Sequence, residues 1–571
     1  MITNLIFFFS VSLLISFSTI GYGLITIRLL KIENLELNYG LIGILGLFFI
    51  SVLGSYTHLI LPHDYIHNSI IILIGILFLI IFRNKNFNQI KTLFIIFCFL
   101  FISILLAKTN EDFGYYHLPN SIQFAQQKLQ FGLGNINHGF KHISSIFQLM
   151  SLNYLPFFKY NLFNLTNFLF LLFFVLFVII NFRNNYKSNL NITNIFIILF
   201  LILFVAKFSR IAEYGSDIAG QITIVFFLFY TFEIAFNQKL NDKYLISYFK
   251  ISIIFITFAI TLKFILVIYS ILYFFVVLVI FKKKLFITIF KEYWLFLPII
   301  ALGIFIFYNF SSTGCLIYPI QKVCFSQKYE WALSSETVNY LNFHYEIWAK
   351  GGKGPNFSVE NPNSYIESFN WVSNWISKYF IGKFTDFLLV TLTILFFFFL
   401  VYLKNFSYSK FKFKNFNSKY IFFYFNLLIV FIIWFLNFPT LRYAGFVIVF
   451  MIISFPFVLL VDEVIDFSLK SNLKKLSIIF VITYTIFLIK NVYRINTELN
   501  LSTNEHHNFK NFPFFWVNNV SSEEFNINGH KVYKVDGMCW GTNSTCVRNI
   551  GNLSIKKKNN YIFYSKKNEI K

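Results

Sequence analysis

A short polar stretch, Asn110–Pro119, carries the side chains best suited to chemistry in this sequence. It reads Asn-Glu-Asp-Phe-Gly-Tyr-Tyr-His-Leu-Pro and follows an apolar run that ends near Ala107. A carboxylate can take the proton of a hydroxyl group as a new bond forms, so Asp112 is the predicted general base and Glu111 its alternative. The end of a membrane span does not by itself require such a cluster of acids and rings. We therefore interpret the stretch as an active-site loop.

Further ionisable residues fall at the ends of later apolar runs. The stretch Lys207–Asp217 is one such loop, Lys263 interrupts a long apolar run, and Arg442 lies in Phe-Pro-Thr-Leu-Arg-Tyr. Ionisable groups at the depth of a membrane interface are costly unless they are paired or functional. Lysine and arginine there can neutralise a phosphate group. The predicted substrate- and phosphate-binding residues are Tyr116, His117, Lys207, Arg210, Glu213, Asp217, Lys263 and Arg442.

The composition indicates which elements position these residues. Of the 571 residues, 57% are hydrophobic and only 13% are charged, whereas soluble proteins carry about a quarter charged residues. So few polar groups cannot cover a single core of this size, but helices of about 20 apolar residues facing lipid explain the excess. We predict an all-α polytopic membrane protein with about fourteen transmembrane helices.

Hydropathy gives the approximate limits of the predicted helices. Lys263 interrupts the apolar run 250–281, which leaves open whether that run forms one broken helix or two short helices. The predicted spans are 4–29, 40–61, 66–82, 92–107, 161–182, 191–207, 218–236, 250–262, 264–281, 294–310, 384–403, 420–437, 443–461 and 476–492.

The positive charges predict the orientation of these spans. The formal net charge is +23, and the lysines and arginines concentrate in alternate short loops between apolar runs. Membrane topology explains this pattern because cytoplasmic loops are enriched in Lys and Arg, so no nucleic-acid partner is predicted. The transmembrane domain covers residues 1–492, with outer loops 108–160 and 311–383, and residues 493–571 form a small extracytoplasmic cap.

Cysteine usage supports the same orientation. Cys98 lies inside a span, Cys315 and Cys324 share one outer loop, and Cys539 and Cys546 share the tail. Disulfides persist in oxidising compartments and are rare in the cytosol. We predict two short-range bridges, each contributing roughly 2–4 kcal/mol to the stability of its loop. A zinc site needs four ligands together, and neither pair has suitable partners nearby.

Two amphipathic segments are predicted to lie at the membrane surface. Pro119 suits the first turn of a helix, and apolar residues between Ile122 and Leu129 share one face of it. Trp371 and Trp375 are spaced at i and i+4, which favours an interfacial helix with a tryptophan belt. A platform that stacks on a sugar ring is the alternative for these two tryptophans.

The acidic pair after an early span, followed by Tyr-Tyr-His and a helix, resembles the first outer loop of GT-C fold glycosyltransferases. The loop ending in Glu213-Tyr-Gly-Ser-Asp217 and the late Arg442 match the general layout of that family. Three shorter motifs look like those of a group of uncharacterised bacterial membrane proteins related to this fold. They are Thr313-Gly-Cys-Leu-Ile-Tyr-Pro with Cys324, Gly132-Leu-Gly-Asn, and Cys539-Trp with Cys546.

The resemblance implies inverting transfer of a sugar from a polyprenyl-phosphate donor to an envelope glycan or lipid acceptor. The catalytic aspartate of that family carries over to Asp112, with Glu111 as the runner-up. The implied location is the bacterial inner membrane, with the active site and both termini facing the periplasm. The acidic loop follows the fourth predicted span here, whereas the family places it after the first. His63 and Asp64, after the second span, therefore stay open as site residues.

Two other function classes fit the same composition. A transporter or flippase of lipid-linked oligosaccharide should hold ionisable residues near mid-membrane and show inverted repeats. An O-antigen ligase or polymerase would use the large loop 311–383 together with Arg442, without Asp112. No definite cofactor is predicted. Glu111 and Asp112 are candidate ligands of Mg²⁺ or Mn²⁺, but two adjacent carboxylates are fewer ligands than such an ion takes.

Overall fold

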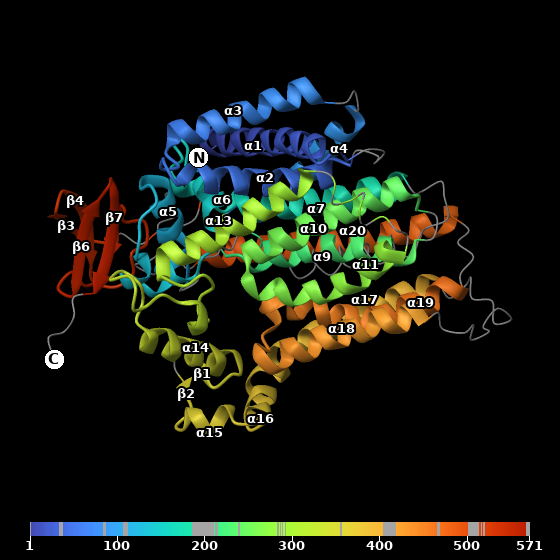
Figure 1. Ribbon diagram of the computed structural model, residues 1–571. Helices are drawn as coiled ribbons and strands as arrows, with labels where there is room; N and C mark the ends of the chain where they lie inside the picture. Colours follow the sequence, from blue (N-terminus) through green and yellow to red (C-terminus); the bar gives the residue numbers. More distant parts are fainter. Residues whose placement is uncertain are drawn as a thin grey trace.

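The protein is a bundle of long helices, most of which run side by side in the computed structural model (Figure 1). At one end of the bundle lie the C-terminal strands and helices α5 (Leu118–Gln126), α14 (Ser335–Ala349) and α16 (Trp371–Trp375). We call this the outer end. The structure describes residues 2–32, 38–83, 87–106, 112–184, 211, 215–237, 240–282, 293–354, 357–402, 418–464, 469–500 and 520–566, with isolated positions between 285 and 291 and between 513 and 517.

The first four helices coincide with the first four predicted spans. They are α1 (Ile2–Leu29), α2 (Tyr39–His58), α3 (Tyr65–Phe82) and α4 (Phe87–Leu100), and α1 packs against both α2 and α3. Asp64 begins α3, because its side chain accepts hydrogen bonds from the backbone N–H groups of Ile66 and His67. A capping role of this kind explains the acid at this position without a catalytic function.

The middle of the bundle consists of α7 (Leu165–Asn184), α9 (Asp217–Phe236), α10 (Asp242–Leu262), α11 (Ile271–Lys282) and α13 (Phe296–Thr313). Lys263 separates α10 from the next helical segment, since its backbone is extended with φ −154° and ψ 109°. A 3₁₀ segment, Phe264–Ser270, leads into α11. The run 250–281 therefore forms two helices that meet at Lys263.

The last helices are α17 (Thr385–Tyr402), α18 (Ser418–Asn437), α19 (Phe446–Val464) and α20 (Leu469–Asn500). Helix α16 continues through a π-helix, Ile376–Phe384, into α17, so the outer loop predicted to end at 383 ends at 370. Similarly, α20 continues beyond the predicted limit at residue 492. In both cases the helix extends through polar residues that a hydropathy criterion excludes.

Within the described residues, nine helices are long and apolar enough to cross a membrane, as expected of a helical membrane protein. Shorter apolar helices cover Asn88–Ile104, Phe264–Leu278, Ile421–Asn437 and Phe446–Pro456, which also fall on predicted spans. The predicted span 191–207 lies outside the described residues. The fold is therefore mostly helical, as the composition predicted.

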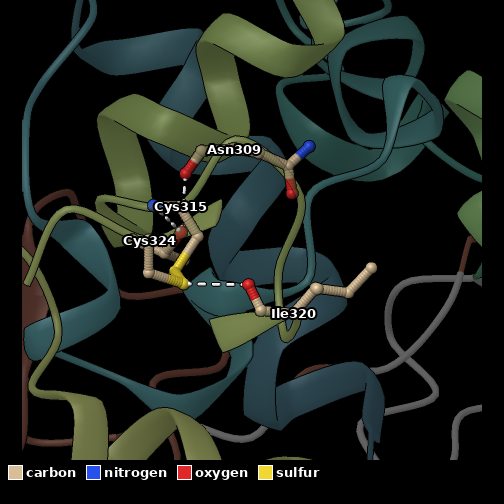
Figure 2. Close-up of a disulfide and its surroundings, with 5 residues drawn as sticks. Asn309, Cys315, Ile320 and Cys324 are labelled. Atoms are coloured by element: carbon tan, nitrogen blue, oxygen red, sulfur yellow. Dashed lines mark hydrogen bonds between the residues drawn. A yellow bond between two sulfur atoms is a disulfide. The ribbon is translucent and has the colours of Figure 1, made fainter. Parts of the chain in front are cut away.

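Both predicted disulfides are confirmed. Cys315 and Cys324 are joined just after the end of α13, and Figure 2 shows the sulfur of Cys324 beside the carbonyl oxygen of Ile320, 3.2 Å away. Cys539 and Cys546 are joined in the C-terminal region. The loop that follows the first bridge contains α14, the short strands β1 (Lys353–Gly354) and β2 (Phe357–Ser358), and α15 (Pro362–Ile366).

The C-terminal cap is built from strands, which corrects the prediction that the whole chain is α-helical. Strands β3 (Ser522–Ile527), β4 (His530–Val535) and β5 (Cys546–Val547) form one sheet, and β6 (Leu553–Lys558) and β7 (Tyr561–Lys566) form a hairpin. The turns between the antiparallel strands are Asn528-Gly529 and Asn559-Asn560, and all four residues have positive φ. Such dipeptides favour tight hairpin turns.

Two predictions about surface helices are wrong. Pro119 does stand in the first turn of α5, but every residue from Leu118 to Ala125 is buried. The helix is therefore covered by protein on all sides and does not lie on the membrane surface. Trp371 and Trp375 are 1% and 4% exposed and pack against Phe435. Neither ring is accessible enough for an interfacial belt or for stacking on a sugar.

Candidate active site at the outer end

Asp112 begins a five-residue π-helix, Phe113–His117, that continues directly into α5. The carboxylate is half-buried, and its charge acts on the hydroxyl of Tyr116 one turn later. Burial, reinforced by Asp112, raises the pKa of Tyr116 well above its usual value, so its phenol stays protonated. This segment therefore presents one acid and one neutral hydroxyl to the same region.

Asp217 and Lys263 form an ion pair between α9 and the break after α10. Asp217 stands in the first turn of α9, where a negative charge is favourable. The ammonium group of Lys263 also lies 3.9 Å from the centre of the Tyr443 ring. The side chains of Lys263 and Asp217 keep 19% and 31% of their surface exposed, so solvent and small polar groups reach this pair.

Arg442 lies in a second π-helix, Leu441–Gly445, between α18 and α19. Its guanidinium carbon is 4.5 Å from the centre of the Trp348 ring and 5.1 Å from that of Tyr443. Its Nη2 also donates a 3.4 Å hydrogen bond to the Tyr443 hydroxyl. Stacking uses the face of a guanidinium, whereas the N–H groups that bind phosphate lie along its edge. The two rings therefore flank the guanidinium group, and Tyr443 also accepts a hydrogen bond from it.

Side chains from four helical segments hold the backbone around Arg442. These hydrogen bonds fix the chain just before the turn and at its start, so the position of Arg442 depends on the neighbouring helices. They run from Gln221 Nε2 to the Arg442 carbonyl (3.4 Å), from Trp375 Nε1 to the Pro439 carbonyl (2.9 Å), from Trp434 Nε1 to the Thr440 carbonyl (3.1 Å), and from the Leu441 N–H to the Tyr379 hydroxyl (2.7 Å).

The charges of these segments act on one another. After burial, which affects the pKa of Lys263, Arg442 and Tyr443 most, the carboxylate of Asp112 also acts on all three groups, and as a negative charge it opposes the lowering of the pKa of Lys263 by burial. The carboxylate of Asp217 acts on Lys263 and Arg442 in the same direction. Two acids and two bases from four distant stretches of sequence thus interact electrostatically at the outer end. We call this group the ionic site.

Burial decides which groups of the site carry charge. It lowers the pKa of Lys263 to about 8, although Asp217 acts in the opposite direction. It lowers the pKa of His117 to about 3, so this imidazole is neutral near pH 7. The Nδ1 atom of His117 is buried, and no group in the described part of the chain bonds it. Lys263 and Arg442, rather than His117, therefore supply positive charge to a ligand.

A network of rings borders the ionic site. The hydroxyl of Tyr345 on α14 lies 3.1 Å from Nε2 of His138, 3.3 Å from Nε2 of His142 and 3.0 Å from the hydroxyl of Tyr318. The ring of His142 is in turn 5.7 Å from that of Tyr116. Tyr318 belongs to the Cys315–Cys324 loop, so the network joins this disulfide loop to the first outer loop.

The structure brings six of the predicted site residues together and leaves four undetermined. Those at the ionic site are Asp112, Tyr116, His117, Asp217, Lys263 and Arg442. Those outside the described residues are Glu111, Lys207, Arg210 and Glu213. His63 does not belong to the group, because its ring nitrogens bond Ser151 and the Gly54 carbonyl within the bundle.

Several further residues that contact the site were not predicted from the sequence. Tyr443 follows Arg442 directly and contacts both cations, so its position next to Arg442 was a usable signal. Trp348 lies in a loop far from Arg442 in sequence, and no local pattern marks it. In the described part of the chain, no group of three or more His, Cys, Asp or Glu residues is placed to hold a metal ion.

Comparison with known proteins adds a family but no activity. The family described as "Domain of unknown function (DUF8201)" matches residues 5–451. No curated protein and no solved structure matches the chain. The matched range includes all four charged residues of the ionic site and ends inside α19. Helix α20 and the strands of the cap lie beyond it.

Proposed function

This chain belongs to the family described as "Domain of unknown function (DUF8201)", and since that description assigns no activity, we propose a function from the ionic site. The protein is an integral-membrane glycosyltransferase that moves a sugar from a polyprenyl-phosphate donor to an envelope glycan or lipid acceptor. The observation that supports this most is the meeting of Asp112 with Lys263 and Arg442 at the end of a bundle of apolar helices.

The cations bind the phosphate of the donor. A polyprenyl chain stays in lipid beside apolar helices, so its phosphate must be recognised at their ends. Arg442, oriented by Trp348 and Tyr443, offers the N–H groups along its edge to the phosphate oxygens. Lys263 adds a second positive charge, and the ion pair with Asp217 holds the ammonium group of Lys263 in the site.

Asp112 acts on the acceptor. The oxygen of an acceptor hydroxyl attacks the anomeric carbon from the face opposite the phosphate, and Asp112 takes the hydroxyl proton as the bond forms. The bond between the anomeric carbon and the phosphate oxygen breaks, and its electron pair leaves with the polyprenyl phosphate. Arg442 and Lys263 stabilise that added negative charge. The configuration at the anomeric carbon is inverted by this single displacement.

The neutral groups of the site bind rather than ionise. The protonated hydroxyl of Tyr116 can donate a hydrogen bond, and the neutral imidazole of His117 can donate one and accept one. Such groups suit the hydroxyls of a sugar. No chemical step is assigned to either residue.

We further propose that the chain crosses the bacterial inner membrane about fourteen times, with the site and both termini in the periplasm. Every predicted span outside 191–207 falls on a described helix, and both disulfides suit an oxidising compartment. Labelling of single cysteines with a membrane-impermeant thiol reagent tests this. Cysteines introduced at exposed Asn543 and Ser522 should react in intact spheroplasts, and no reaction before lysis would contradict the orientation.

A ligase or polymerase of lipid-linked glycans is the second candidate. Trp348, from the large outer loop, contacts Arg442, as that class would require. The ligase hypothesis assigns no role to Asp112, whereas the charge of Asp112 acts on the same arginine. The size of the donated group separates the two functions, because a glycosyltransferase adds one sugar and a ligase transfers a preformed glycan.

The decisive experiment uses the full-length protein in nanodiscs. Native mass spectrometry should show polyprenyl phosphate binding, with polyprenol, which lacks the phosphate, bound far more weakly. A panel of polyprenyl-phosphate sugars then identifies the donor by product mass. Asp112→Asn should bind polyprenyl phosphate normally and lose turnover by about 10²–10⁴-fold.

Asp386 provides the matched control, because it is an exposed carboxylate near the same end of the bundle, at the start of α17. Asp386→Asn should behave as the unmodified protein. Equal binding of polyprenol and polyprenyl phosphate would refute the proposed donor class. Full turnover in Asp112→Asn would refute the role of Asp112 as the base.

A further inference from the structure

The C-terminal cap contacts the start of the segment that carries Asp112 through a tryptophan. Trp540 lies in the loop closed by the Cys539–Cys546 disulfide, which we call the Trp540 loop. Its backbone N–H donates a 2.9 Å hydrogen bond to the carbonyl of Gly114, and its ring is 5.9 Å from that of Phe113. Both partners belong to the π-helix that Asp112 begins.

Gly114 is a glycine because the Trp540 ring occupies the space of a side chain. A Cβ atom at this position would lie 2.4 Å from two ring carbons of Trp540, well inside any normal contact distance. The ring is 8% exposed and therefore largely enclosed between the cap and the bundle. The fit is close enough that the position of the loop and the position of the π-helix determine each other.

The cap also contacts the ring of Tyr115 and the far end of α5. The guanidinium carbon of Arg548, two residues after Cys546, is 4.6 Å from the centre of the Tyr115 ring. The backbone N–H of Ser544 donates to Oε1 of Gln126 (2.8 Å). Contacts from the Trp540 loop and from Arg548 therefore hold both ends of the segment Asp112–Gln126.

The C-terminal part of the chain also holds the residues just before this segment. The guanidinium of Arg494, on α20, donates hydrogen bonds to the carbonyls of Leu105 and Leu106. The N–H of Leu106 donates to the carbonyl of Pro513 (3.0 Å). The described residues on both sides of 107–111 thus depend on contacts with residues after 490.

We propose that the cap positions the Asp112 segment for catalysis, with Trp540 as its principal positioning residue. The proposal rests on the proposed function in one respect, the role of Asp112 as the base. Positioning matters because displacement of a catalytic group by about 1 Å can cost about 10²-fold in rate. Trp540 contacts Phe113 and Gly114 directly after Asp112, so its loss should change turnover and leave phosphate binding in place.

Hydrogen exchange of the full-length protein in nanodiscs tests the proposal without any substrate. Trp540→Ala should speed amide exchange in residues 112–126 and leave α9 and α13 unchanged. Trp540→Phe, which keeps a ring, should give an intermediate result. Phe525→Ala removes a partly exposed ring from strand β3 of the same cap and should match the unmodified protein.

Binding and turnover measured on the same variants complete the test. Trp540→Ala should keep its Kd for polyprenyl phosphate within about twofold and lose about 10–100-fold in kcat. Unchanged exchange in residues 112–126 would overturn the proposal, and so would faster exchange spread over the whole chain, which would indicate a role in folding only. If the unmodified protein transfers no sugar, the proposed function fails, while the exchange result still decides whether Trp540 positions the segment.

Discussion

The acid side of the ionic site, at Asp112, and its cation side, at Arg442, both lie at a π-helical turn, but different parts of the protein hold the two turns in place. Asp112 precedes the π-helix Phe113–His117, and Arg442 lies within the π-helix Leu441–Gly445. Each of these turns runs directly into a longer helix, and π-helical turns are frequent at functional sites. The acid side is held from outside the bundle by Trp540 of the cap. The cation side is held from inside it, by side chains of α9, α16 and α18.

This difference indicates that the two sides can be disturbed separately. The residues that hold Arg442 are part of the helices that form the bundle, so they cannot move without it. The Trp540 loop belongs to a small cap that lies beyond residue 451, where the family match ends. Binding of the donor phosphate should therefore depend on the bundle and on Trp348 of the large outer loop, whereas proton transfer should depend on the bundle and the cap.

The largest effect expected on donor affinity comes from Arg442→Ala. A charge-assisted hydrogen bond contributes about 1.5–3 kcal/mol, and about 1.4 kcal/mol corresponds to tenfold in affinity. The affinity for polyprenyl phosphate, measured by native mass spectrometry in nanodiscs, should thus fall by about 10–100-fold. Amide exchange in residues 112–117 should not change. Faster amide exchange in that segment would show that the structure around Asp112 depends on Arg442, and it would refute the separation of the two sides.

Replacement of each disulfide by a pair of serines is the next test. Cys539→Ser with Cys546→Ser loosens the loop of Trp540 and should lower turnover by about tenfold without changing the Kd for polyprenyl phosphate. Cys315→Ser with Cys324→Ser loosens the loop that precedes α14, which carries Trp348. It should raise that Kd several-fold and leave turnover at saturating donor unchanged. The same response from both variants would contradict the separation of the two sides.

Local patterns in the sequence were sufficient to find the chemical groups. Asp112 and Arg442 were found because charged residues are rare beside long apolar runs. Lys263 marked the break between two helices for the same reason, and close spacing in a loop or tail indicated both cysteine pairs. Each of these features is expressed within a few residues of sequence.

The supports could not be predicted, because they are contacts between residues far apart in the chain. Nothing near Gly114 indicates that its missing side chain makes room for Trp540. The contact of Trp348 with Arg442 is of the same kind. The strands of the cap are a different case, since the turns Asn528-Gly529 and Asn559-Asn560 were visible in the sequence and are typical of hairpins.

Donor affinity measured over a series of pH values tests the contribution of Lys263 to the cation side. Lys263, whose pKa burial lowers to about 8, is charged below that pH and loses its charge as the pH rises through it. Polyprenyl phosphate keeps a constant charge above about pH 7, because its second pKa is near 6. Because Lys263 loses its positive charge over this range, the affinity of the protein for polyprenyl phosphate should fall several-fold between pH 7 and pH 9.5. Lys263→Arg keeps the charge at every pH and should abolish this dependence; a decline that persists in that variant would assign it to another group.

The smallest expected effect tests whether the two sides communicate. Tyr345→Phe removes the hydroxyl shared by His138, His142 and Tyr318, and leaving such half-buried groups unpaired costs at most about 1–3 kcal/mol in stability. Its effect on either turnover or donor affinity should stay below about threefold. Because Tyr345 links the first outer loop to α14, combining Tyr345→Phe with Trp540→Ala measures the coupling. Independent sides require the two effects on turnover to add within about 0.5 kcal/mol, and a larger deviation would identify the ring network as the path that connects acid and cation.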